Sequence, residues 1–149
     1  MLFGQNRDQL RQIYFETWRK YQSHLPMEPL EKMVADVILQ HPEYHALLET
    51  PENSLNKEYP PEVGESNPFL HMGMHIGIRE QLTTDRPAGI RVLYQKLLKR
   101  HQDVHAVEHL IMECLAEMIW QAQRKKIAPD EASYLACLRK NTEGISGLS

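Results

Sequence analysis

Apolar residues recur along the chain at three- and four-residue intervals, the period of an amphipathic α-helix. One stripe lies near the N-terminus, and a second follows a break at residues 24–26. The members of the stripes are Leu10, Ile13, Tyr14, Trp18 and Tyr21, then Leu30, Met33, Val34, Val37 and Ile38. We expect Asn6 to cap the first helix, with Gln9 completing a capping box. Pro42 should end or kink the second helix, because proline lacks a backbone donor.

The second half of the chain repeats this helical pattern between turn signals. Asn67 and Pro68 should open a helix that runs to about Thr83. A helix from about 90 to 100 and a helix over 104–124, capped by Asp103, could be separate or one bent helix. A last helix is expected from 129–131 through Leu138. With no strand pattern, the sequence predicts an all-α fold: a single-domain bundle of about five to six helices over residues 1–140.

Two segments lack this period. The stretch TPENSLNKEYPPEVGES, residues 50–66, is rich in Pro, Asn, Glu and Ser. It predicts a loop that is long for so small a domain, and such loops tend to be functional or mobile. The polar tail, residues 141–149, is expected to be disordered.

Charge and cysteine content limit the classes of function. The formal net charge of the 149 residues is -3, whereas a nucleic-acid-binding protein normally has a basic face. No apolar run reaches transmembrane length, and the N-terminus is too polar for a signal peptide. Cys114 and Cys137 have no CxxC spacing and fall within predicted helices, so we expect reduced core thiols. The sequence therefore predicts a cytoplasmic protein that binds neither nucleic acid nor membrane.

Histidine spacing is the strongest chemical signal. Eight histidines in a chain of this length would give about 0.4 pairs four residues apart by chance. The sequence has four such pairs: His41/His45, His71/His75, His101/His105 and His105/His109. Residues four apart in a helix lie on the same face, so two imidazoles can bind one metal ion from one side.

Two helices with this spacing predict one metal site. His71 and His75 lie on one helix, and His105 and His109 on another, so the four rings could converge if the helices pack together. Glu113 follows on the same stripe as His109, either as a fifth ligand or as a hydrogen-bond partner of a ligand ring. We favour zinc or iron, and we predict no organic cofactor.

Other readings of the histidines remain open. They could be core or pH-sensitive packing residues in a non-enzymatic module that binds another protein or itself. His41 and His45 are weaker candidates because Pro42 interrupts their spacing. The sequence does not show whether His101 joins the others.

Enzymatic activity is left open by the motifs. The segment HAVEH fits the inverzincin pattern H-x-x-E-H, in which Glu108 would be the general base, although such enzymes are normally larger. An open metal position, which the sequence does not show, would allow a hydrolytic or redox reaction, with residues 50–66 as a lid. The Glu-x-x-His signature of ferritin-like proteins is absent, and hemerythrin-like or DinB-like bundles are closer by analogy.

Three blocks carry a family resemblance: PLEKMVADVILQHPEYHALLE, NPFLHMGMHIGIREQLTTDRPAGI and HAVEHLIMECLAEMIWQAQR. They resemble a family of small proteobacterial proteins known as domain of unknown function 1841, from about Leu10 to Arg124. The resemblance implies a bacterial cytoplasmic protein. It brings no activity, substrate or catalytic residue, so the metal hypothesis depends on the spacing alone.

Overall fold

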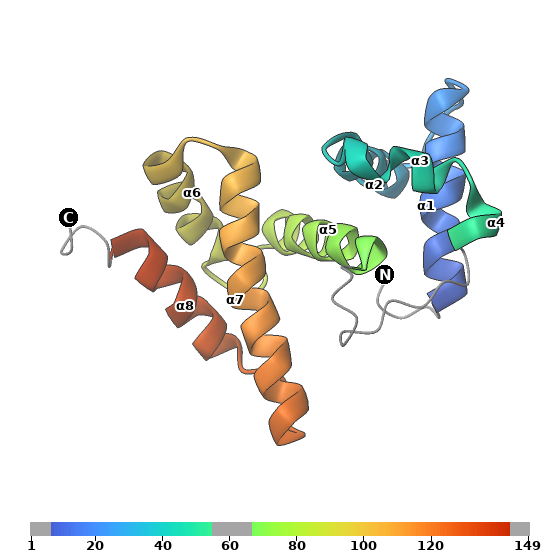
Figure 1. Cartoon of the computed structure of the whole chain (residues 1–149). Coiled ribbons are helices and arrows are strands. Elements are labelled where there is room, and N and C mark those ends of the chain that lie inside the picture. The colour runs from blue at the N-terminus through green and yellow to red at the C-terminus, as the bar shows by residue number, and fades with distance from the viewer. Residues whose placement is uncertain (1–6, 55–66, 144–149) are drawn as a thin grey trace. The chain divides into compact units, whose positions relative to one another are not determined.

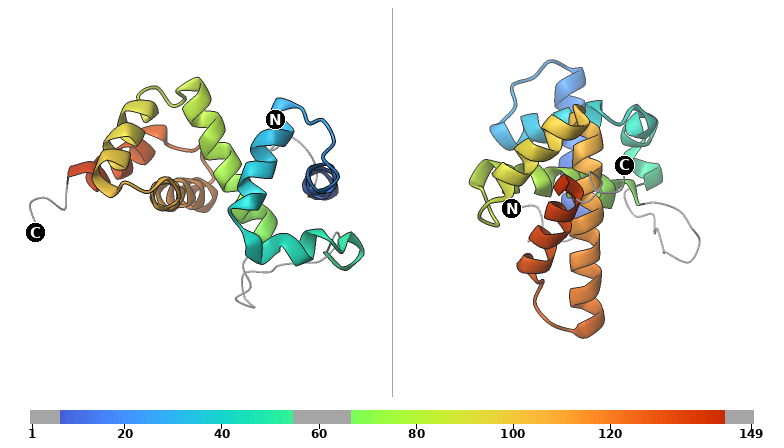
Figure 2. Two further views of the ribbon diagram at one scale, coloured as in Figure 1. Left: turned by 90° about the horizontal axis from the view of Figure 1, so that it is seen from above. Right: turned by 90° about the vertical axis from the view of Figure 1, so that its left-hand side faces the viewer.

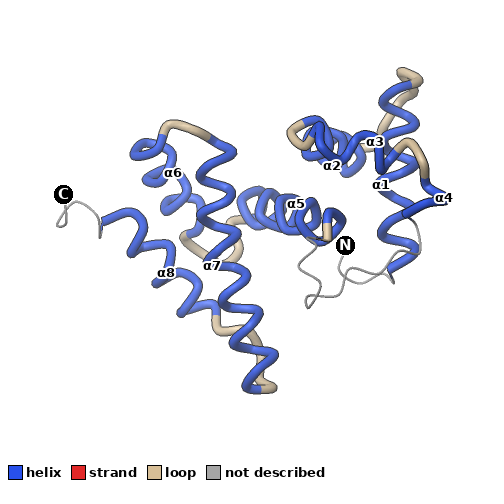
Figure 3. Tube along the Cα trace, viewed as in Figure 1, coloured by secondary structure: helices blue, strands red, loops and turns tan. Residues whose placement is uncertain are grey.

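The computed structural model describes residues 7–54 and 67–143, and within them the chain is helical with no strand (Figure 3). The prediction of an all-α fold is confirmed. Six helices have eleven residues or more: α1 Arg7–Gln22, α2 Pro29–Leu39, α5 Pro68–Thr84, α6 Ile90–His101, α7 Val104–Lys125 and α8 Glu131–Glu143. The short helices α3 (His45–Leu48) and α4 (Pro51–Ser54), with the 3-10 helix Pro42–Tyr44, take the number above the predicted five to six.

Contacts divide the chain into two compact units, residues 1–76 and 77–149, with the boundary inside α5. The first unit contains α1 to α4 and the beginning of α5. The second contains the rest of α5 with α6, α7 and α8 (Figure 1). The extent of the predicted domain, residues 1–140, stays a prediction.

The first unit is built on an aromatic core between α1, α2 and the start of α5. Helix α1 lies beside α2, as the left-hand view of Figure 2 shows with α1 nearly end-on. Phe69 on α5 contacts the rings of Tyr14 and Phe15 at centroid distances of 5.8 and 5.9 Å. The other buried members are Trp18, Val34, Val37, Ile38, Leu48, Met72 and Ile76. The predicted stripes supply Tyr14, Trp18, Val34, Val37 and Ile38 to this core, because a helical period aligns them on one face of each helix. The predicted members Tyr21 and Leu30 are exposed instead.

The second unit packs α6, α7, α8 and the rest of α5 around aliphatic side chains. After the turn that follows Lys125, α8 returns along α7, and α6 contacts both (Figure 1). The fully buried aliphatic residues include Ile78, Ile90, Leu97, Val107, Ile111 and Leu138.

Helix starts follow the predicted capping residues. The Asn67 side chain accepts hydrogen bonds from the backbone of Phe69 and Leu70 at the start of α5. Asp103 caps α7 in the same way. Gln102 adopts a left-handed conformation (φ 59°) that ends α6, so α6 and α7 are two helices rather than one bent helix. A side chain that satisfies free backbone N–H groups fixes where a helix begins.

The cysteines differ from the prediction. Cys114 on α7 and Cys137 on α8 form a disulfide, with their Cα atoms 5.8 Å apart, so the expectation of reduced thiols is wrong. Their spacing of 23 residues gave no sign of this. The pairing depends on α8 folding back along α7, which brings two distant positions together.

Three further predictions concern segment ends. Residues 51–54 of the predicted loop form α4, and residues 55–66 lie outside the described residues, as does Asn6. The last helix continues past Leu138 to Glu143, so the predicted tail begins within α8 and its remainder lies outside the described residues. Of the helices in the described part, none has both the length and the apolar character of a membrane span.

Candidate metal-binding residues

His41 is held at the end of α2 by the backbone of that helix. Its Nδ1 lies 2.7 Å from the carbonyl oxygen of Val37, and its backbone N–H donates to the carbonyl of Ile38. Pro42 then starts the 3-10 helix, so the chain turns at His41 instead of continuing α2. This turn leaves the His41 ring buried, with 2% of its surface exposed.

Three histidine rings gather in the first unit. The centroid of His41 lies 4.9 Å from that of His71 and 4.8 Å from that of His75, while His71 and His75 are 5.0 Å apart. His75 has no exposed surface, and Tyr44 stacks on His41 at 5.4 Å. The helical spacing predicts His71 and His75, whereas Pro42 makes His41 a weak candidate in the sequence. The tertiary fold brings His41 to the other two.

The hydrogen bond to Val37 fixes the proton of His41. A carbonyl oxygen can only accept, so Nδ1 must carry the hydrogen, and in the neutral ring Nε2 bears the lone pair that a metal ion needs. A ring held through its other nitrogen by a backbone carbonyl is the usual arrangement of a histidine ligand. The ligand nitrogens of His41 and His75 lie within 4.8 Å of each other.

His45 does not share this environment, although it is four residues from His41. Its Nε2 donates to the carbonyl of Ile38 at 2.9 Å, and its ring lies 4.3 Å from the ring of Trp18. Because Pro42 interrupts the helix between them, the side chains of His41 and His45 do not lie on one helix face. His45 is therefore a packing residue of the first unit.

The second unit contains the pair His105 and His109 on α7. Their ring centroids are 4.2 Å apart in an edge-to-face arrangement, and their ligand nitrogens lie within 4.8 Å of each other. Both rings are partly buried. The helical spacing that predicted this pair is borne out, since both residues belong to one uninterrupted helix.

Glu108, the predicted general base, is buried beside the pair on α7. Its exposed surface is 2%, and its Oε2 accepts a hydrogen bond from Nε of Arg79 on α5 at 3.3 Å. A guanidinium at this distance favours the ionised carboxylate. Burial, and then the negative charge of Glu108, raise the pKa of Tyr94 on α6. Glu108 has a structural partner in Arg79, and its role as a base stays a prediction.

Glu113 and His101 complete the sequence candidates. Glu113 is exposed on α7, and its role as a ligand stays a prediction. His101 ends α6, and its Nε2 is buried with no hydrogen-bond partner among the described residues. Neither residue belongs to the group of histidines that offers ligand atoms.

Four histidines each offer one imidazole nitrogen suited to a metal ion: His41, His75, His105 and His109. The first two belong to the first unit and the last two to the second. Imidazole nitrogen is a good ligand for zinc, iron, copper and nickel. The sequence predicts convergence of a different set, with His71 in place of His41, and that convergence stays a prediction.

The fold and these side chains define an all-α protein with histidine pairs suited to a metal ion. The chain belongs to the family described as domain of unknown function (DUF1841), whose model matches residues 6–140. This match confirms the family resemblance seen in the sequence. No curated protein and no solved structure matches the chain.

Proposed function

We propose that this protein binds a transition metal ion, zinc or iron, through its histidine pairs. The observation that carries the proposal is the buried pair His41 and His75, which comes from two different helical segments of the first unit. Val37 holds the His41 ring in the form that a metal ligand requires.

The geometry of the first unit supports this proposal. Two nitrogens bound to one tetrahedral zinc ion lie about 3.3 Å apart, given zinc–nitrogen bonds of about 2.05 Å. The ligand nitrogens of His41 and His75 lie within 4.8 Å, so small ring rotations would bring them to that distance. Ring centroids of two bound imidazoles are about 5 Å apart by the same calculation. All three centroid distances among His41, His71 and His75 are close to this value.

The pair on α7 supplies two more ligands of the same kind. His105 and His109 repeat the arrangement of two imidazoles on neighbouring turns. Two nitrogens are half of a tetrahedral shell, so each pair alone would leave positions for water or another ligand. The sequence predicts that His71 and His75 serve one ion together with His105 and His109. The metal-to-chain ratio distinguishes one shared ion from two separate ions.

Elemental analysis of tagless protein, purified without chelator, tests the proposal. We expect at least one equivalent of zinc or iron per chain, or its uptake when Zn²⁺ or Fe²⁺ is added. His41→Asn is the matched variant, because the Asn amide can still donate to the Val37 carbonyl while the ligand nitrogen is removed. We expect this variant to keep its helical content and to lose metal affinity by about 100-fold.

Two other histidines serve as controls. His24→Asn removes an exposed histidine at a left-handed position (φ 56°) that Asn tolerates. His45→Gln retains an amide donor for the Ile38 carbonyl. Both should bind metal like the wild type. Absence of metal in wild-type protein, with none taken up from added Zn²⁺, Fe²⁺ or Co²⁺, would refute the proposal.

A second candidate function is an interaction module whose histidines serve packing. The edge-to-face contact of His105 with His109 and the contact of His45 with Trp18 favour it, because aromatic contacts of this kind stabilise a core without metal. This candidate predicts concentration-dependent association, measurable by sedimentation, and identical behaviour with and without chelator. We retain a bacterial setting, with no nucleic-acid or membrane partner, as part of the proposal. Because the two cysteines are bonded, the cytoplasmic location is supported by the family resemblance alone.

A further inference from the structure

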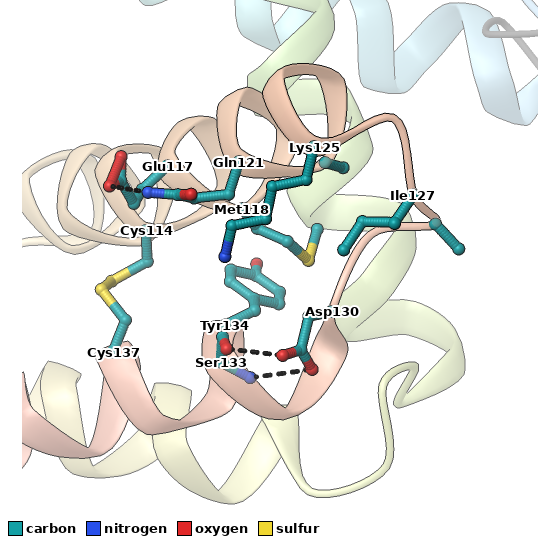
Figure 4. A pocket seen from close by; sticks show the side chains of 12 residues that line it. Cys114, Glu117, Met118, Gln121, Lys125, Ile127, Asp130, Ser133, Tyr134 and Cys137 are labelled. Carbon is teal, nitrogen blue, oxygen red and sulfur yellow. Dashed lines mark hydrogen bonds between the residues drawn. A yellow bond between two sulfur atoms is a disulfide. The ribbon is translucent and has the colours of Figure 1, made fainter.

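The Cys114–Cys137 disulfide borders a pocket between α7 and α8 in the second unit. The pocket has a volume of about 320 Å³, and both cysteines line it (Figure 4). Lys125, Met118 and Tyr134 line it as well, and Figure 4 shows the disulfide at one end of the space around the Tyr134 ring. A small molecule in this pocket would therefore lie beside both disulfide-bonded residues.

The two sulfurs have unequal surroundings. Cys114 is buried, with 2% of its surface exposed, whereas Cys137 is partly exposed. The side-chain amide of Asn141 donates to Sγ of Cys114 at 3.8 Å and to the carbonyl of Cys137 at 3.0 Å. Hydrogen bonds to sulfur stabilise a thiolate more than a disulfide sulfur, because the thiolate carries a full charge.

We propose that this disulfide is a redox-active site that exchanges with small thiols, with Cys137 as the attacked sulfur and Cys114 as the leaving thiolate. This proposal does not depend on metal binding. It makes the disulfide a reversible modification site.

The exchange is balanced with a dithiol as reductant. One thiolate of the dithiol attacks Sγ of Cys137, a new S–S bond forms, and the bond to Cys114 breaks with its electron pair passing to Cys114. The second thiol of the reductant, as a thiolate, then attacks the reductant's own sulfur in the mixed disulfide and releases the Cys137 thiolate. The dithiol is oxidised by two electrons to a cyclic disulfide, and its two protons pass to the two protein thiolates.

Asn141 acts as a positioning residue in this exchange. Its amide is anchored on the Cys137 carbonyl within the same helix, so the second N–H remains directed at Cys114 before and after cleavage. A thiol whose anion is stabilised leaves faster in thiol–disulfide exchange. The arrangement therefore favours attack at Cys137, the more exposed cysteine, and departure of the thiolate of the buried Cys114.

Reduction of the folded full-length protein by dithiothreitol, followed by alkylation and mass spectrometry, tests the site. We expect native protein to be reduced at a rate within about tenfold of guanidinium-unfolded protein, with helical content retained. Resistance until the chain unfolds would overturn the proposal and leave a purely structural cross-link.

The direction of attack has a separate test. A monothiol, 2-mercaptoethanol, is added to folded protein, the mixture is quenched with acid, and the released thiol is alkylated. We expect the adduct on Cys137 and the alkyl group on Cys114. The reverse pattern would overturn the assignment of the two sulfurs.

Asn141→Leu removes the donor while keeping the same number of side-chain heavy atoms and the same branching, and it should slow reduction by about fivefold. Gln123→Leu, the same chemical change at an exposed site on α7, should leave the rate unchanged. Equal rates in the wild type and in Asn141→Leu would refute the role of Asn141.

Discussion

The two histidine pairs of this protein are similar in chemistry but different in origin. His105 and His109 lie one turn apart on α7, and their contact follows from helix geometry alone. His41 and His75 are 34 positions apart in the sequence, and they meet because the first unit folds α2 and α5 around a common core. His41 and His75 are also more deeply buried than His105 and His109.

This difference shows which interactions each pair depends on. The pair on α7 should persist wherever that helix is intact, and the helix is secured by its cap and by the disulfide to α8. The pair of the first unit depends on aromatic packing, with no covalent link among the described residues of that unit. Substitutions in the two units should therefore affect the two pairs separately.

The largest expected effect is on the aromatic core of the first unit. Phe69→Ala should lower the free energy of unfolding by about 3–5 kcal/mol, because it removes the ring between Tyr14 and Phe15 and leaves a cavity. Leu70→Ala, at the next position but 59% exposed, should cost about 0.5 kcal/mol or less. Urea unfolding followed by circular dichroism measures both, and equal costs would contradict this account of the core.

The next effect concerns the covalent link of the second unit. Replacing both cysteines by serine should lower the free energy of unfolding by about 3 kcal/mol, since the disulfide closes a loop of 23 residues. Denaturant curves of the oxidised wild type and of the double variant give this difference. The variant should still bind metal at His41 and His75. Loss of that binding would show that the histidine pair of the first unit depends on the cross-link in the second.

A third prediction tests the ion pair that joins α5 to α7. Arg79→Met should lower stability by about 2 kcal/mol, because the buried Glu108 carboxylate loses its cationic partner while Arg79 itself is partly exposed. Lys96→Met, at an exposed position on α6, is the matched control and should be nearly neutral. Thermal unfolding distinguishes the two, and an equally neutral Arg79→Met would show that the pair adds no stability.

A fourth and smaller effect should follow from the cap of α7. Asp103 accepts hydrogen bonds from the backbone of His105 and Ala106, so Asp103→Ala should cost about 1 kcal/mol. Asp103→Asn keeps a capping oxygen, and its free energy of unfolding should differ from that of the wild type by only about a few tenths of a kcal/mol. Hydrogen exchange of the first turn of α7 should increase in the Ala variant, and unchanged exchange would argue against the cap.

The smallest effect is a change of pKa at the start of α8. The Ser133 hydroxyl, and then backbone N–H groups of Ser133 and Ala132, hold the pKa of Asp130 below its ordinary value. A lowered pKa stabilises the fold at pH values above about 3.9, the ordinary pKa of Asp. This contribution is lost as the pH falls through the lowered pKa.

Ser133→Ala should therefore raise the pKa of Asp130, measurable by NMR titration of its carboxyl carbon. The lowered pKa of Asp85, which results mainly from the backbone N–H of Arg91, should not change and serves as an internal control. No shift at Asp130 would contradict the role of the Ser133 hydroxyl.

Much of the helical architecture was predictable, because its signals are local. The start of α5 at Asn67 and Pro68 and the cap of α7 at Asp103 each depend on residues within one turn. The apolar stripes of α1 and α2 predicted core residues, because a helical period places them on one face. The family was also recognisable from sequence blocks alone.

The cysteines and the candidate metal ligands were only partly predictable. The Cys114–Cys137 bond requires α8 to return along α7, and a spacing of 23 residues contains no information on that path. His41 was given little weight because Pro42 breaks the helix after it. That same break turns the His41 ring toward His71 and His75.

The sequence by itself determined the helices, their capped starts, the pair on α7 and the family, since each depends on neighbours along the chain. Tertiary structure decided that His41 joins His75, that His45 packs against Trp18, and that the two cysteines are bonded. The physical reason is that helical periodicity fixes the direction of a side chain relative to its own helix. Which distant side chain it meets depends on how the helices pack.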